Sequence, residues 1–311
     1  MENESMSELS EISLDPFYIP PRGKYPIFFL GVIIYLFAVF CNMTLLALII
    51  FQRKLHTPMY FILFSLPLND LVGISAMLPK VLSDIVTGTR KVYYHLCLLQ
   101  AFLLHMYGGG VLFILAAMAF DRYMAICMPL RYRSVMTMRT VVSVACLVWG
   151  LDFLLILSLF VLQTRLPKCR SAVLNVFCDN PSLLKLSCGS TALNNIVGLV
   201  TTAVMQMLSV SVQLFSYIRI LMACLGSRRS EAKTKAINTC MSQLIIFCIF
   251  EIVGTFTILS HRFQNVSPDL QKIMGMLIFL VPPILNPIVY GLKTSEIRNT
   301  LLGLARNKIS A

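Results

Sequence analysis

The feature that most constrains this chain is a set of seven long apolar runs, each with at most one formal charge. A helix of about 20 apolar residues is long enough to cross the ~30 Å hydrocarbon core of a bilayer. Because lipid offers no hydrogen bonds to an exposed backbone, such segments must be helical. The sequence therefore predicts an all-α membrane protein, a bundle of seven transmembrane helices. The runs are Tyr25–Gln52, Leu55–Pro79, Val92–Phe120, Thr140–Thr164, Leu186–Ile218, Ala236–His261 and Ile273–Leu292.

Composition supports the membrane assignment. With 57% hydrophobic residues, 13% charged residues and a mean hydropathy of +0.79, the chain is too apolar for a soluble globular protein. A net charge of +12 would suit nucleic acid if it were clustered on a soluble domain. Here the basic residues lie in short loops between apolar runs, as membrane topology requires. We therefore expect membrane lipid as a partner and no nucleic acid.

The charged loops predict the orientation. With the N-terminus outside, fifteen of the 26 Lys and Arg residues fall on the inner side. The first 24 residues are acidic and lack the apolar core of a cleavable signal peptide, so the first run must act as the insertion signal. We expect an extracellular tail over residues 1–24, the bundle over 25–293, and a cytoplasmic tail over 294–311. This last tail contains a short amphipathic eighth helix, from Ser295 to Leu304. Asn3, in Asn3-Glu4-Ser5, is the expected glycosylation site.

Short motifs point to a family. The decapeptide Met118-Ala119-Phe120-Asp121-Arg122-Tyr123-Met124-Ala125-Ile126-Cys127 lies where the third run meets a basic loop. With four further motifs it resembles the olfactory receptors, a family of rhodopsin-like G-protein-coupled receptors. The four are Leu55-His56-Thr57-Pro58-Met59-Tyr60-Phe61, Ser216-Tyr217-Ile218, Lys235-Ala236-Ile237-Asn238-Thr239-Cys240 and Pro282-Pro283-Ile284-Leu285-Asn286-Pro287-Ile288-Val289-Tyr290. One departure is Pro67, where the family usually has serine. The resemblance covers nearly the whole chain.

The resemblance implies a function. It predicts an odorant receptor at the plasma membrane of olfactory sensory neuron cilia. Odorant binding would activate a stimulatory, olfactory-type heterotrimeric G protein and raise cyclic AMP. The tetrapeptide Ser260-His261-Arg262-Phe263 resembles class I, fish-like members, whose ligands include carboxylic acids.

The resemblance also implies a switch in the inner half of the bundle. The guanidinium of Arg122 can pair with Asp121 in a closed state and turn to carbonyls of a G-protein helix in an open state. Asp70 and Asn286 are expected to form a hydrogen-bonded switch at the bundle centre. Val111, which stands where many members have an acid, argues against strong sodium binding. The expected switch residues are Asp70, Asp121, Arg122, Tyr123, Tyr217, Asn286 and Tyr290.

The ten cysteines divide into two groups. Cys97, Cys169, Cys178 and Cys188 lie on the outer side, where four cysteines allow three pairings that sequence alone does not resolve. The resemblance implies Cys97–Cys178 and Cys169–Cys188. The other six are expected to be free thiols near or within the spans. No metal-ligand spacing occurs, so we expect neither a metal nor a cofactor.

Helix geometry places the ligand site. His105 and Glu251 each lie about 24 Å above the inner face at ~1.5 Å per residue, and we expect them to pair. An acid or other polar odorant would be held at the rim by Arg262, and an amine held by Glu251 is the alternative. Asp152 is assigned to packing between helices. The expected lining is His105, Gly108, Gly109, Gly198, Thr202, Glu251, Thr255, Ile258 and Arg262.

Other functions of membrane proteins fit less well. A transporter would show an internally repeated half, which the sequence lacks. A retinal protein needs a lysine within the last run, and Ile273–Leu292 has none. Asp70 and Asp152 come without the motif of an intramembrane protease. We therefore expect no enzyme, and the alternative function is a non-olfactory rhodopsin-like receptor for a small metabolite.

Overall fold

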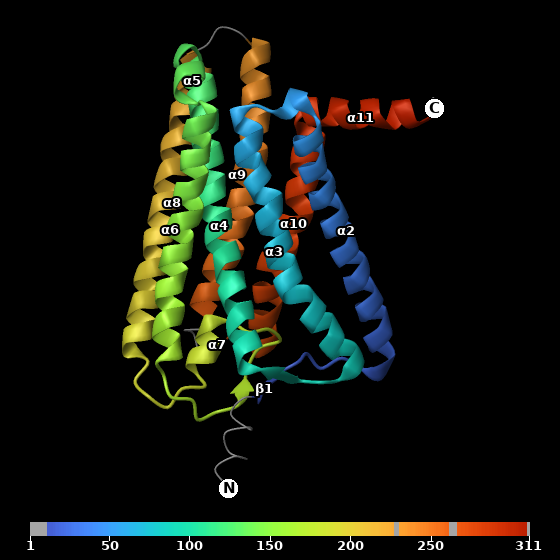
Figure 1. Cartoon of the computed structure of the whole chain (residues 1–311), viewed down its shortest axis with the longest axis vertical. Coiled ribbons are helices and arrows are strands. Elements are labelled where there is room, and N and C mark those ends of the chain that lie inside the picture. The colour runs from blue at the N-terminus through green and yellow to red at the C-terminus, as the bar shows by residue number, and fades with distance from the viewer. Residues whose placement is uncertain (1–10, 227–229, 261–265, 310–311) are drawn as a thin grey trace.

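The computed structural model describes residues 11–226, 230–260 and 266–309. Long helices lie side by side, and the first and the last described residues are at opposite ends of the bundle (Figure 1). The bounds are β1 Glu11–Leu14, η1 Pro21–Gly23, α2 Lys24–Phe51, η2 Arg53–Leu55, α3 Pro58–Thr87, β2 Lys91–Tyr93, α4 Tyr94–Cys127, α5 Pro129–Val135, α6 Met138–Thr164, β3 Ala172–Val173, α7 Asn180–Leu184, α8 Ala192–Gly226, α9 Ser230–Ser260, α10 Pro268–Lys293 and α11 Ser295–Ile309.

Seven of the helices in these ranges, α2, α3, α4, α6, α8, α9 and α10, are long and apolar enough to cross a membrane. The predicted all-α bundle of seven spans is therefore confirmed. Several helices extend past the apolar runs, because a helix continues beyond the hydrocarbon into charged sequence. The third run was predicted to begin at Val92, but Val92 belongs to β2 and α4 begins at Tyr94.

Helix α4 is the most deeply buried of these spans. Three of its backbone carbonyls accept hydrogen bonds from polar side chains of neighbouring helices. Asn69 of α3 donates to Tyr107, Ser209 of α8 donates to Leu112, and Gln243 of α9 donates to Leu115, all at 2.9 Å. A buried polar side chain must find such a partner in an apolar interior. These bonds fix the positions of α3, α8 and α9 around α4.

One end of the bundle, here called the disulfide end, carries a small sheet. Its strand order is β2-β1-β3, with β1 antiparallel to β2 and parallel to β3. Two disulfides lie at the same end, Cys97–Cys178 and Cys169–Cys188. They are the two pairings that the resemblance implies. The sheet was not predicted, because residues 1–24 were expected to be an extracellular tail outside the bundle.

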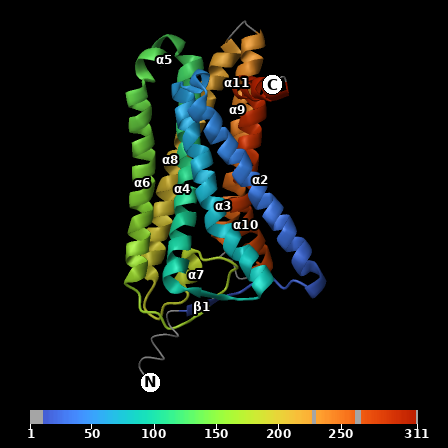
Figure 2. The same ribbon diagram turned by 45° about the vertical axis from the view of Figure 1, so that its right-hand side comes forward.

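The opposite end, here called the α11 end, carries α5 and α11. Helix α11 turns sideways at the end of α10 and points away from the bundle, crosswise to the spans (Figures 1 and 2). Ile297 is fully buried against the bundle, whereas Leu302 is exposed. Residues 295–304 therefore form a helix as predicted, which continues to Ile309.

The first prediction concerns the Cys97–Cys178 bond, which joins α4 to the loop over the disulfide end. Both cysteines are fully buried, and they are 81 residues apart in sequence. Closing a loop of this length lowers the entropy of the unfolded chain by an amount worth about 4–5 kcal/mol. We expect Cys97→Ser and Cys178→Ser to lose surface delivery, measured by antibody labelling of intact cells. The exposed free thiol Cys146 gives the control, Cys146→Ser, which should be delivered normally. Normal surface labelling of both test variants would contradict the role of this bond.

The second prediction concerns Lys272, whose side chain is only 5% exposed at the disulfide end. Its ammonium lies 2.7 Å from Asp15, in the chain that follows β1. Asp15→Asn leaves a buried cation without its nearest partner, so we expect the melting temperature of the purified receptor to fall. Because Asp15 is half exposed, the loss should be only about 1 kcal/mol. The Glu11–Lys91 pair is more exposed, and Glu11→Gln should change nothing measurable. Equal melting of the two variants would show that the buried pair adds no stability.

Candidate ligand pocket

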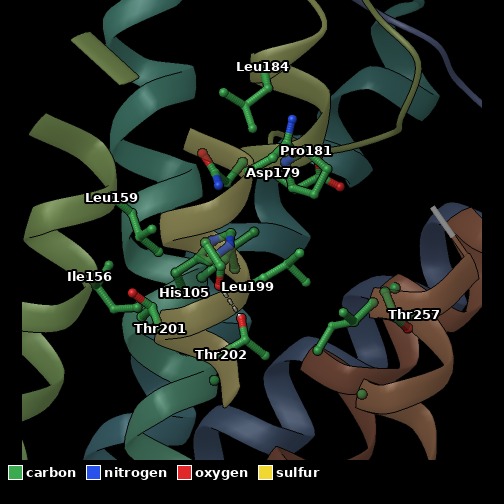
Figure 3. A pocket seen from close by; sticks show the side chains of 18 of the residues that line it. His105, Ile156, Leu159, Asp179, Pro181, Leu184, Leu199, Thr201, Thr202 and Thr257 are labelled. Atoms are coloured by element: carbon green, nitrogen blue, oxygen red, sulfur yellow. Dashed lines mark hydrogen bonds between the residues drawn. The ribbon is translucent and has the colours of Figure 1, made fainter. Parts of the chain in front are cut away.

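A cavity of about 560 Å³ lies toward the disulfide end of the bundle. Helices α4, α6, α8, α9 and α10 form its walls, and α7 with its flanking loop covers it. Ile156 and Leu159 of α6 approach from one side, Thr257 of α9 lies on the other, and Leu184 of α7 lies above (Figure 3). This volume is within the usual range for small-molecule sites.

The α4 wall contains three of the predicted residues. His105, Gly108 and Gly109 all line the cavity. Nδ1 of His105 bonds the carbonyl of Ala101 at 2.8 Å, and its ring packs edge-on against Phe160 of α6. The glycines differ in what they permit. A Cβ at position 108 would meet no atom within 4 Å, whereas one at position 109 would collide with other helices.

The α8 wall contains two more predicted residues. Gly198 and Thr202 line the cavity, and the Thr202 hydroxyl donates to the Gly198 carbonyl at 2.9 Å (Figure 3). This bond within the helix satisfies the hydroxyl as donor, yet its oxygen can still accept from a ligand. Thr201, Met205 and Gln206 of the same helix also line the cavity.

The α9 wall corrects one prediction. Ile258 lines the cavity together with Phe250, Gly254 and Thr257, but Thr255 is exposed and does not. Positions 250, 254, 257 and 258 follow the i, i+4, i+7, i+8 spacing of one helix face. Thr255 is one residue past that face, and a rotation of about 100° per residue turns it outward.

The predicted pair of Glu251 with His105 is not formed among the described side chains. Glu251 does not line the cavity itself. It instead shares a hydrogen bond with Gln206 of α8. The reason is that Nδ1 of His105 bonds its own helix and its ring faces α6, while Glu251 faces α8. Equal depth in the bilayer does not ensure that two side chains face each other.

The loop over the cavity contributes residues that were not predicted. Asn175, Phe177 and Asp179 line it, and Asn175 donates to Asp179 at 2.7 Å. Asp179 also caps α7 by accepting from the backbone of Ser182. Their position near Cys178, which is bonded to Cys97 at the start of α4, could have identified them from the sequence.

Two predicted residues, Arg262 and the glycosylation site Asn3, lie outside the described residues.

At the α11 end the expected Asp121–Arg122 pair is not formed. The carboxylate of Asp121 accepts from the hydroxyl of Tyr132 in α5 at 2.9 Å, and no ion pair joins it to Arg122 among the described residues. Burial, together with the negative charge of Asp121 and the bond to it, raises the pKa of Tyr132, so the tyrosine stays protonated as a donor. The guanidinium of Arg122 is left for other partners.

The remaining switch residues surround Arg122 or lie deeper. Arg122 lies within electrostatic range of Tyr217 and Tyr290, whose buried hydroxyls have no hydrogen-bond partner in the described ranges. Tyr123 packs against Phe215, with 5.1 Å between ring centroids. At the bundle centre Asn286 donates to Asp70 at 2.8 Å, joining α10 to α3. Among the described residues, no cluster of three His, Cys, Asp or Glu side chains could hold a metal ion.

Comparison with known proteins identifies the family. Residues 31–308 match the model of the family described as "Olfactory receptor". The chain belongs to the olfactory receptor family. It is 37% identical to human "Olfactory receptor 52H1", covering 87% of each chain. It is also 32% identical to rat "Olfactory receptor 1", covering 97% of this chain and 96% of the rat protein. The chain is thus a multi-pass membrane receptor and not an enzyme, with odorants and G proteins as the general partners of its family.

The third prediction uses two adjacent glycines of this olfactory receptor. Gly108 faces open space, whereas a Cβ on Gly109 would collide with Asp152 and Met205. Overpacking of this kind costs about 1–3 kcal/mol. We expect Gly109→Ala to lower surface delivery severalfold in flow cytometry. Gly108→Ala should be delivered normally and should respond less to bulky ligands. Equal delivery of both variants would contradict the packing assigned to Gly109.

Proposed function

We propose that this chain is an odorant receptor that binds a small odorant in the cavity and activates a stimulatory, olfactory-type G protein, so that cyclic AMP rises. The observation that carries the proposal is the placement of two features on one helix. His105 of α4 lines the cavity, and Arg122 lies farther along the same helix, about 25 Å away at ~1.5 Å per residue. Family membership supports the ligand class and the G protein only in general terms.

The orientation that we propose places the disulfide end outside the cell. Disulfides form and persist in oxidising compartments, which this end would face. The α11 end would then face the cytoplasm, with α11 along the inner surface of the membrane. The proposed location is the plasma membrane of olfactory sensory neuron cilia. The class I assignment stays a prediction, because residues 261–263 of its tetrapeptide lie outside the described residues.

Arg122 is the proposed contact with the G protein. Asp121 is already bonded to Tyr132, so this carboxylate does not have to release Arg122 before the guanidinium can turn to a partner. An arginine can bond several backbone carbonyls at a helix end through its planar set of donors. Tyr217 and Tyr290, each with a buried hydroxyl and no partner of its own in the described ranges, can hold the guanidinium after the helices move.

The fourth prediction tests this contact. Arg122→Ala should abolish the cyclic AMP response to any agonist of the parent receptor and leave surface delivery intact. The control is Arg133→Ala, a substitution of a second basic residue at the α11 end, in α5. It should keep most of the response. A full response from Arg122→Ala would show that this guanidinium does not couple the receptor.

A further inference from the structure

The floor of the cavity, farthest from the disulfide end, offers mainly hydrogen-bond acceptors. Gln206 lines the cavity, and its side chain shares a hydrogen bond with Glu251. The Oε1 atoms of both residues are buried and have no partner. With one N–H of the Gln206 amide donating to Glu251, the two unpartnered Oε1 atoms are a carbonyl and a carboxylate oxygen. Neither can donate to a ligand.

A second carboxyl group lies directly behind this wall. Asp152 of α6 is fully buried, and neither of its carboxyl oxygens has a partner. It lies against the backbone of Gly109, a cavity residue, and the absence of a Cβ at that position is what allows the approach. Gly109 also meets Met205, the neighbour of Gln206. Asp152 and Glu251 therefore both lie close to the same short stretch of α8.

His105 adds a further acceptor. The carbonyl of Ala101 can only accept, so Nδ1 of His105 carries the proton in the bond between them. In the neutral ring Nε2 is then an acceptor. Among the described side chains, the floor thus offers acceptors, has two carboxyl groups directly behind it, and lacks a cation.

Among the described residues, the cations that line the cavity belong to its cover and not to its floor. Arg170 and Lys185 are exposed and belong to the loop ahead of α8. Gln206 lies fourteen residues into α8, roughly 21 Å along its axis. No ion pair found among the described residues involves Glu251 or Asp152.

We infer that the ligand is a small amine, bound as its ammonium ion at Gln206 with its charge offset by Glu251. The inference rests on the proposed function and specifies its ligand class. An ammonium supplies only donors, which match the unpartnered carbonyl oxygen of Gln206 in the cavity wall. It also neutralises a carboxylate that is costly to bury alone in a membrane protein. Asp152 places a second carboxyl group behind the Gly109 backbone. The apolar side chains Leu112, Ile156 and Phe250 would contact the alkyl part.

The test compares three ligands with one carbon skeleton: hexylamine, hexanol and hexanoic acid. The full-length receptor is expressed in cells with a cyclic AMP reporter, and surface delivery is measured in parallel. We expect hexylamine to be the strongest agonist of the parent. Glu251→Gln keeps the size of the side chain and its bond to Gln206 but removes the charge. It should raise the half-maximal concentration for the amine about tenfold or more and leave that for the alcohol unchanged.

Three further substitutions test the other carboxyl groups and the Gln206 acceptor. Asp152→Asn should weaken the amine response by less than Glu251→Gln does, because Asp152 acts from behind the wall. Asp269→Asn removes an exposed carboxylate of α10 and should have no effect. If Glu251→Gln fails to reach the surface, Gln206→Leu, which removes the carbonyl acceptor, should still abolish the preference for the amine.

A binding measurement separates the ligand from the coupling. Hexylamine should raise the melting temperature of the purified receptor, and Glu251→Gln should remove this shift. A shift without cyclic AMP would contradict the proposed G protein and still support the amine. An amine response unchanged in Glu251→Gln would overturn the inference. So would a response to hexanoic acid that is lost only in Arg262→Ala.

Discussion

Hydrogen bonding inside a medium that offers none is the constraint on which the rest of this receptor depends. The spans satisfy their own backbones as helices, but their polar side chains need partners from other helices. Asn69, Ser209 and Gln243 find them at three carbonyls of α4. Each bond forms only when the neighbouring helix has one position along the bundle axis and one rotation about its own axis. The central helix thereby sets the positions of the helices around it.

Close approach is the second condition that α4 meets. Gly109 admits Asp152 and Met205, and Gly110 admits Asn69. Gly108 has no such neighbour and instead opens into the cavity. Three consecutive glycines thus serve packing on two sides and ligand space on the third. One helix can combine these roles because successive residues point about 100° apart.

The sequence was sufficient for the spans, because long apolar runs and a membrane leave only helices as a solution. It also selected His105, Gly198 and Thr202, which line the cavity. It was not sufficient for rotation about each helix axis, which decided that Thr255 faces outward and that Glu251 meets Gln206 and not His105. The partner of Asp121 was missed for a related reason. Tyr132 lies in the short helix α5. A helix of this length has too few residues for its hydrophobic periodicity to predict how it packs against α4.

The strand β1 has a consequence for how the receptor is assembled. Ser13 pairs with residues 171 and 172, and its side-chain bond to Ser171 spans 158 positions of the chain. A ribosome adding about 5–20 residues per second needs roughly 8–30 s to make that intervening chain. Until then the N-terminal segment has no partner strand on the β3 side. The strand β1 therefore completes its pairing only after four spans and the first part of the following loop exist. During this interval the segment stays accessible to solvent, because the sheet has not yet formed.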